Sequence, residues 1–135
     1  MLKISKNFTL EEFTESNLAK KLNIDNRIEK SEYISNICNL VEYVLQPLRD
    51  YLGVPIHINS GYRCKELNRV VGGVYNSQHM TGKAADIVCK DLSKAMKWII
   101  ESKKFDQVIR YNDFIHVSYD TFNNRKQVIH KNLKS

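Results

Sequence analysis

The hydrophobic pattern has helical spacing in one long segment and strand spacing after it, and this change most constrains the fold. Between residues 31 and 52, apolar side chains recur every three or four positions, as on the buried face of a helix: Ile34, Ile37, Cys38, Val41, Val44, Leu45, Leu48 and Leu52. Gly53 and Pro55 provide the expected stop. Pro47 predicts a kink or a separate last turn, because proline has no backbone N–H to donate.

Strand patterns occupy most of the chain after Pro55. Ile56 and Ile58 alternate with polar neighbours, as in a half-buried strand. Further short strands are predicted at residues 84–89, 105–109, 115–119 and 127–130, and one amphipathic helix, capped by Asp91, at residues 92–102. Because helices come first and strands cluster later, we expect an α+β fold: a small, mainly antiparallel sheet with helices packed against it, rather than a doubly wound α/β fold.

A shorter helix is predicted to start near residue 9. Thr9 is placed to cap it, and Glu12, three residues later, is placed to reach back as in a capping box. Phe8 is expected to pack onto Phe13 as a hydrophobic staple. These residues indicate local structure rather than a site.

The composition is that of one folded domain, taken as residues 1–135. A chain of 135 residues, 42% hydrophobic, is long enough for one core and too short for two. Its three cysteines lack the CxxC spacing of a thiolate zinc site, and their odd number does not indicate a disulfide framework. The first residues interrupt their apolar positions with lysines, unlike a signal peptide, and no segment is long enough to span a membrane. We therefore expect synthesis in the cytoplasm and no membrane insertion.

The net charge of +6 predicts an anionic partner. Residues 53–135 hold fourteen Lys and Arg against seven Asp and Glu, whereas residues 1–52 hold seven against eight. Nucleic acid, a membrane surface and a bacterial cell wall are all compatible with this excess. A nucleic-acid partner is disfavoured, because no motif interleaves aromatic and basic residues.

The least periodic part of the chain, residues 60–86, carries the first candidate site. His79 precedes Asp86 by seven residues, and Gly82 between them permits a tight reversal. Asp86 belongs to an otherwise apolar predicted strand, where a buried carboxylate without a cation or hydrogen bonds costs several kcal/mol. Asp86 therefore needs a partner.

His116 provides a third element. Strand alternation puts Ile115 and Val117 on one face and His116 on the other. Two histidines and a carboxylate are a ligand set expected of a catalytic zinc, which keeps a fourth position for water. Asp113, three residues before His116, is offset to act as a general base beside that water. By spacing alone, the alternative stays open that these side chains satisfy loop backbones.

The motifs around these residues resemble those of the zinc D-Ala-D-Ala carboxypeptidases. Residues 77–86 match the pattern SxHxxGxAxD at every specified position, and Ser-Gly-Tyr-Arg at 60–63 and Asp-x-x-His at 113–116 extend the match. The same superfamily contains lysostaphin-type peptidases, vancomycin-resistance dipeptidases, phage endolysins and the hedgehog amino-terminal domain. The similarity covers nearly the whole chain and implies the fold of that superfamily and a zinc-dependent peptidase.

The resemblance implies that His79, Asp86 and His116 bind one zinc ion per chain. It further implies that Asp113 is the catalytic base. Arg63 matches a family arginine that binds the substrate backbone and stabilises the developing oxyanion, a role that suits its permanent charge.

Ser77, Gln78 and Tyr111 are assigned to substrate binding together with Arg63. Tyr111 stands where several relatives have a histidine, and its phenol can still donate a hydrogen bond to an oxyanion. Cys64, directly after Arg63, raises the alternative of a cysteine hydrolase. No histidine and acid pair is left to activate it once His79 and His116 bind zinc, so we disfavour that alternative.

The resemblance implies hydrolysis of peptidoglycan stem peptides, either release of terminal D-Ala or an endopeptidase cut such as L-Ala to D-Glu. We expect a monomer that attacks the cell wall after release, as in phage or prophage lysis, and we interpret the basic half of the chain as attraction to an anionic wall. The main alternative is a non-catalytic zinc or peptide-binding module on the same fold, against which the retained Asp113 and Arg63 argue.

Overall fold

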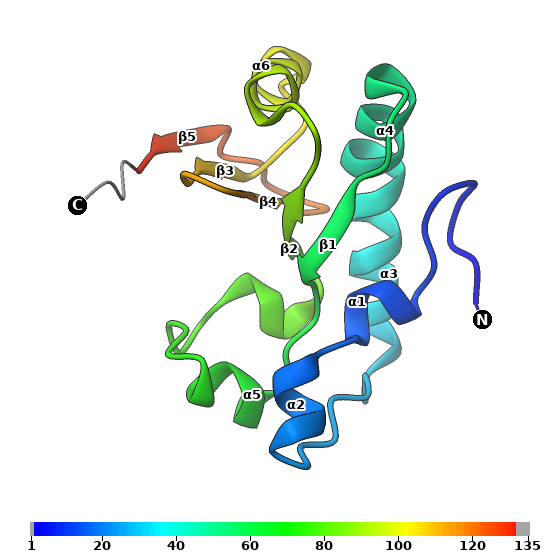
Figure 1. The fold of residues 1–135 in the computed structure, drawn as a ribbon, viewed down its shortest axis with the longest axis vertical. Coiled ribbons are helices and arrows are strands. Elements are labelled where there is room, and N and C mark those ends of the chain that lie inside the picture. The colour runs from blue at the N-terminus through cyan, green and yellow to red at the C-terminus, as the bar shows by residue number, and fades with distance from the viewer. Residues whose placement is uncertain (1, 132–135) are drawn as a thin grey trace.

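Five strands form one sheet with helices on both sides, so the predicted α+β class is confirmed (Figure 1). The computed structural model describes residues 2–131. Its α-helices are α1 (Glu11–Thr14), α2 (Asn17–Lys21), α3 (Ser31–Leu40), α4 (Gln46–Leu52), α5 (Lys65–Val70) and α6 (Leu92–Ser102), with a π-helical segment η1 (Val41–Leu45) and a 3-10 helix η2 (Gln78–Thr81). The strands are β1 (His57–Ser60), β2 (Ala84–Val88), β3 (Gln107–Arg110), β4 (Ile115–Ser118) and β5 (Gln127–His130).

The sheet has the strand order β1-β2-β4-β3-β5. Every neighbouring pair is antiparallel except β3 and β5, which are parallel. The predicted strands are confirmed with small shifts at their ends. The largest shift is in β3, which begins at Gln107 rather than at the buried Phe105.

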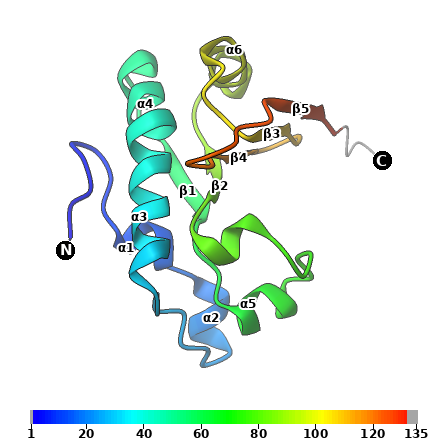
Figure 2. The same ribbon diagram turned by 180° about the vertical axis from the view of Figure 1, so that it is seen from behind.

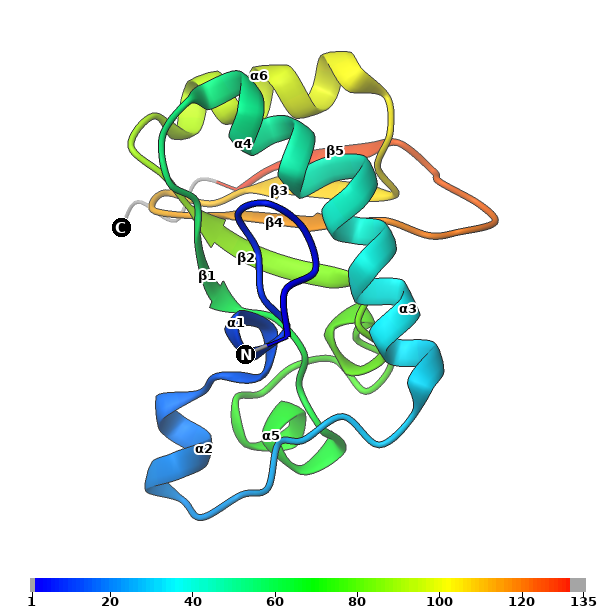
Figure 3. The ribbon, with the colours of Figure 1, turned by 90° about the vertical axis from the view of Figure 1, so that its right-hand side faces the viewer.

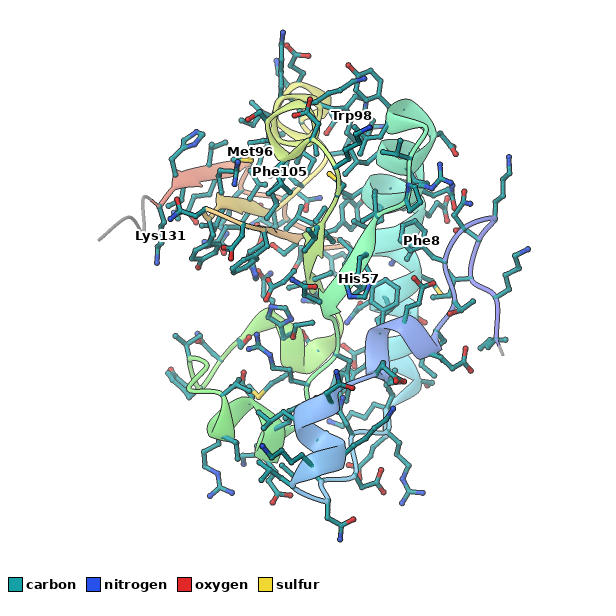
Figure 4. All side chains as sticks on the ribbon, in the orientation of Figure 1. Phe8, His57, Met96, Trp98, Phe105 and Lys131 are labelled. Atoms are coloured by element: carbon teal, nitrogen blue, oxygen red, sulfur yellow. The ribbon has the colours of Figure 1, made fainter. Side chains whose placement is uncertain are left out.

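The two faces of the sheet have different neighbours. Helices α6 and α4 lie above the sheet in Figure 3, whereas η2 and α5 lie below it. The side towards α6 and α4 forms the core, with fully buried side chains from both layers: Leu48, Ile87, Ile99, Val108, Ile115 and Val117. Figure 4 shows Met96 and Phe105 in the region between α6 and the strands. Residues that alternate with these strand positions face the side of η2 and α5.

The predicted long helix runs without a break from α3 through η1 to α4 (Figure 2). Pro47 does not split off a last turn, so that alternative is wrong. The irregularity is instead the π-helical segment before it, in which Gln46 N–H donates to Val41 O, five residues back. A widened turn before Pro47 accommodates the missing donor. The buried face follows the predicted spacing, although Ile34, Cys38 and Leu52 are only half-buried.

The predicted helix starts are confirmed in part. The rings of Phe8 and Phe13 lie 6.5 Å apart, and Glu12 Oε1 accepts a hydrogen bond from Thr9 N–H at 2.7 Å. The Thr9 hydroxyl binds the same Glu12 oxygen at 3.2 Å and does not cap α1, whose N-cap is Leu10. Asp91 caps α6 as predicted, accepting from Lys94 N–H at 3.0 Å. Within residues 2–131, none of the helices has the length and apolar character needed to cross a membrane.

Candidate metal centre

Three of the predicted site residues converge from three separate elements. His79 lies in η2, Asp86 in β2 and His116 in β4, and their potential ligand atoms all lie within 4.8 Å of one another. Oδ1 of Asp86 is 3.3 Å from Nε2 of His79 and 2.9 Å from Nδ1 of His116. The two imidazole rings meet edge to face, with centroids 5.2 Å apart.

Sheet pairing brings Asp86 and His116 together. The antiparallel register places Asp86 directly opposite His116. Their neighbours Ile87 and Ile115 are fully buried on the core side. Both polar side chains therefore project from the opposite face, towards η2.

The turn of η2, outside the sheet, brings His79 to Asp86 and His116. Its first residue is preceded by Ser77, whose hydroxyl accepts a hydrogen bond from His79 N–H at 3.2 Å. Gly82 ends the turn with φ +79°, and a Cβ there would lie 2.4 Å from Tyr33 O in α3. Only glycine permits both this backbone conformation and this close contact, so α3 fixes the end of the turn.

A backbone acceptor orients the ring of His79. Nδ1 lies 2.7 Å from the carbonyl oxygen of Gly61, and the side chain is 3% exposed. A carbonyl oxygen only accepts, so Nδ1 donates, and Nε2 is the ring nitrogen that faces Asp86. Metal-bound histidines usually carry such a second hydrogen bond, which fixes the tautomer and the direction of the ring.

Asp86 is ionised despite its burial. Desolvation acts to raise the pKa of its carboxyl, but hydrogen bonds from His116 and His79 outweigh it and hold this pKa far below its usual range. Nη2 of Arg63 lies 3.6 Å from the second carboxylate oxygen, Oδ2. The carboxylate is therefore surrounded by nitrogen groups that favour its charged form.

Arg63 is held rigidly beside the carboxylate of Asp86. Its Nε donates to Ser60 Oγ and its Nη1 to Asn68 Oδ1, both at 3.1 Å. A Cβ at Gly73 would lie 2.2 Å from Asn68 Oδ1, so glycine is required for this arrangement. Burial lowers the pKa of Arg63, and the charge of Asp86 opposes that shift. The guanidinium stays charged and points at the site in one orientation.

The remaining predicted residues do not contribute atoms to this cluster. Asp113 is exposed, in the turn between β3 and β4 that Tyr111 N–H closes by donating to Phe114 O at 3.0 Å. The ring of Tyr111 stacks on that of Phe114, with centroids 4.4 Å apart, and the ammonium of Lys131 lies 5.8 Å from the Tyr111 centroid. Gln78, next to His79, donates from Nε2 to Asp106 Oδ2 at 2.9 Å.

Cys64, which we disfavoured as a catalytic nucleophile, has a structural role. Its Sγ accepts from Leu67 N–H at 3.5 Å and caps α5, and its own N–H donates to Asn26 Oδ1 at 2.7 Å. His57 and His130 are exposed and are not part of the ligand cluster found among residues 2–131. Figure 4 shows His57 on β1.

Two buried polar residues of this region were not predicted. Asn68 is 3% exposed and positions Arg63, and Asp106 is 3% exposed and binds Gln78. The sequence did offer one indication of Asp106: it follows the apolar Phe105 within a predicted strand, where a carboxylate needs hydrogen-bond partners.

The cluster fits a zinc ion by the chemistry of its donors. Two imidazole nitrogens and one carboxylate oxygen are the common ligands of catalytic zinc, and three protein ligands leave a position open. The sequence model of the family described as peptidase M15 matches residues 6–118, which include His79, Asp86 and His116. The chain belongs to the peptidase M15 family.

The peptidase M15 family comprises zinc-dependent D-Ala-D-Ala carboxypeptidases and their relatives, which confirms the resemblance drawn from the motifs. Membership and the His-Asp-His cluster together make this M15 protein a metallopeptidase by family. A search among curated proteins finds no match to the chain.

Proposed function

We propose that this M15 protein hydrolyses peptidoglycan stem peptides, as a D-Ala-D-Ala carboxypeptidase or as an endopeptidase of the L-Ala to D-Glu type. One observation carries the proposal: Nε2 of His79 and Nδ1 of His116 converge on the same oxygen of Asp86. In a chain of this family, two imidazole nitrogens and a carboxylate oxygen that converge in this way support a catalytic metal site.

His79, Asp86 and His116 would hold the ion. When bound, zinc supplies Lewis acidity that lowers the pKa of a water and polarises the scissile carbonyl. The ligands require no large rearrangement, because Gly61 already orients His79 and the sheet register already pairs Asp86 with His116. The guanidinium of Arg63 beside Oδ2 favours the ionised form of Asp86, which a metal ligand must have.

Asp113 is proposed as the general base. It takes a proton from the attacking water at its carboxylate and returns that proton to the leaving amine. Its turn is well anchored, since Nη1 of Arg110 donates to Asn112 O at 3.0 Å and also to Tyr111 O. An exposed carboxylate on a fixed turn can exchange protons with solvent between cycles.

Arg63 is proposed to bind the substrate and to stabilise the oxyanion. Its guanidinium is fixed by Ser60 and Asn68 and stays charged beside Asp86. A preorganised cation stabilises developing negative charge without a cost of reorganisation. Ser77, Gln78 and Tyr111 are proposed to contact the peptide on either side of the centre.

The proposed site of action is the bacterial cell wall, reached by release of the protein in phage or prophage lysis. Most of the positive charge is carried by residues 53–135, the part of the chain that contains the ligands and Asp113. Peptidoglycan stem peptides and wall polymers carry carboxylates or phosphates, so this half of the molecule would be attracted to them.

Mass spectrometry of purified muropeptides tests the proposal and names the bond. Zinc-loaded protein is expected to release products whose masses identify loss of D-Ala or separation of L-Ala from D-Glu. His79→Ala is the matched control and should yield no product. If the wild-type protein binds zinc and leaves every muropeptide intact, the chain is instead a non-catalytic zinc module.

A further inference from the structure

A buried carboxylate outside the metal centre connects the turn of His79 to the segment between β4 and β5. Asp106, directly before β3, is 3% exposed. Its Oδ1 accepts from Arg125 N–H at 2.8 Å and from Arg125 Nε at 2.9 Å, and its Oδ2 accepts from Arg125 Nη2 at 3.0 Å. The same Oδ2 accepts from Gln78 Nε2 at 2.9 Å.

This arrangement is more than a surface ion pair. The guanidinium of Arg125 meets Asp106 through two parallel N–H groups, the strongest geometry for this pair. Burial acts to raise the pKa of Asp106, and the hydrogen bonds from Arg125 and Gln78 outweigh it and lower this pKa. The backbone of Asp106 is fixed as well, donating to Ser118 O at 2.8 Å and accepting from Gln127 N–H at 2.9 Å.

Gln78 links the fixed Asp106 to the turn that carries His79. It directly precedes His79 in η2, and its carbonyl oxygen accepts from Lys83 N–H at 3.0 Å. On the opposite side, Asn36 of α3 donates from Nδ2 to Thr81 O at 2.9 Å. The short turn that carries His79 is thus held by α3 on one side and by Asp106 on the other.

We propose that Asp106 and Arg125 are positioning residues for the metal centre, which act through Gln78 on the turn that carries His79. Arg125 lies beyond residues 6–118, the part matched by the family model. The cation of this network therefore comes from a segment that the match does not cover. The inference concerns zinc binding at the site of the proposed function, and it does not require the protein to cleave a peptide.

Zinc affinity measured without substrate tests the proposal. Competition with a chromophoric chelator is applied to the wild type, Arg125→Gln, Gln78→Met and the double variant. Each single substitution is expected to raise the zinc dissociation constant about tenfold, the lower end for groups that orient metal ligands. The double variant should bind no more weakly than the weaker single variant, because both changes interrupt the same connection.

Gln78→Met separates a positioning role from a general loss of stability. It leaves the pair of Asp106 and Arg125 intact, so the fold is retained even where Arg125→Gln unfolds. Lys126→Gln is the matched control, since it removes a neighbouring exposed cation that has no ion pair among residues 2–131. It should bind zinc as the wild type does.

Two results would overturn the proposal: wild-type zinc affinity in Gln78→Met, or effects of the two substitutions that simply add in the double variant. A wild-type protein that binds zinc but cleaves no muropeptide refutes the proposed function and leaves this inference standing.

Discussion

Gly61 packs against the backbone of Phe13 so closely that no side chain fits between them. A Cβ on Gly61 would lie 2.7 Å from both Cα and O of Phe13. The neighbouring Tyr62 N–H donates to the same Phe13 O at 2.6 Å. Because the carbonyl of Gly61 accepts from His79 Nδ1, helix α1 holds the acceptor that orients a proposed metal ligand.

Gly61→Ala should therefore weaken both the fold and zinc binding. The methyl group must displace α1 or the loop, at a cost of about 1–3 kcal/mol in the free energy of unfolding. The shifted carbonyl should lower zinc affinity about tenfold. Thermal unfolding and chelator competition measure the two effects. Asn59→Ala, at an exposed position of β1, is the control and should change neither.

Asp113→Ala should slow catalysis strongly and leave zinc binding unchanged. Asp113 is exposed and lies outside the ligand cluster, so its loss removes proton transfer and no ligand. The expected fall in kcat is about 10²–10⁴-fold, the usual contribution of a general base. Steady-state cleavage and zinc titration of the same preparation measure both quantities. Asn112→Ala is the neighbouring control, and cleavage at the wild-type rate by Asp113→Ala would mean that another group is the base.

Asp106→Asn should reduce stability at neutral pH and less so in acid. The pKa of Asp106 is lowered in the folded protein, so its carboxylate stabilises the fold above its unfolded pKa of about 4. That stabilisation is lost as the pH falls through the lowered folded value. Urea unfolding of the metal-free proteins should show a deficit of about 1–3 kcal/mol at pH 7 that narrows below about pH 4. A deficit that does not change with pH would show that packing, and not charge, carries the effect.

Added salt should slow the digestion of intact cell walls. The positive charge of residues 53–135 attracts an anionic polymer. Salt screens this attraction, because at about 0.15 M ionic strength the Debye length is only about 8 Å. Initial rates on purified sacculi should fall with sodium chloride, while kcat on a small soluble stem peptide changes little. Equal salt sensitivity of the two substrates would argue against attraction by the wall.

Local patterns in the sequence predicted the helices, the strands and the convergence of three side chains. The helical spacing of residues 31–52 and the alternation around His116 are properties of neighbours along the chain, and both appear in the structure. His79, Asp86 and His116 were found through a contiguous motif and one strand, and they meet as expected. The separate last turn predicted at Pro47 was wrong because the rule for proline does not say that a π-helical turn can absorb the missing donor.

The sequence by itself determined the fold class, the family and the three side chains that converge, because hydrophobic periodicity and motif spacing are properties of residues close together in the chain. Only the tertiary structure decided that α1 supports His79 through Gly61, and that Arg125 reaches Gln78 through Asp106. These contacts join residues that are 18 to 48 positions apart in the chain. The need for glycine at position 61 is seen only when Phe13 is placed beside it. The packing of the helices and strands decides which distant residues come into contact, and a local sequence pattern does not predict this.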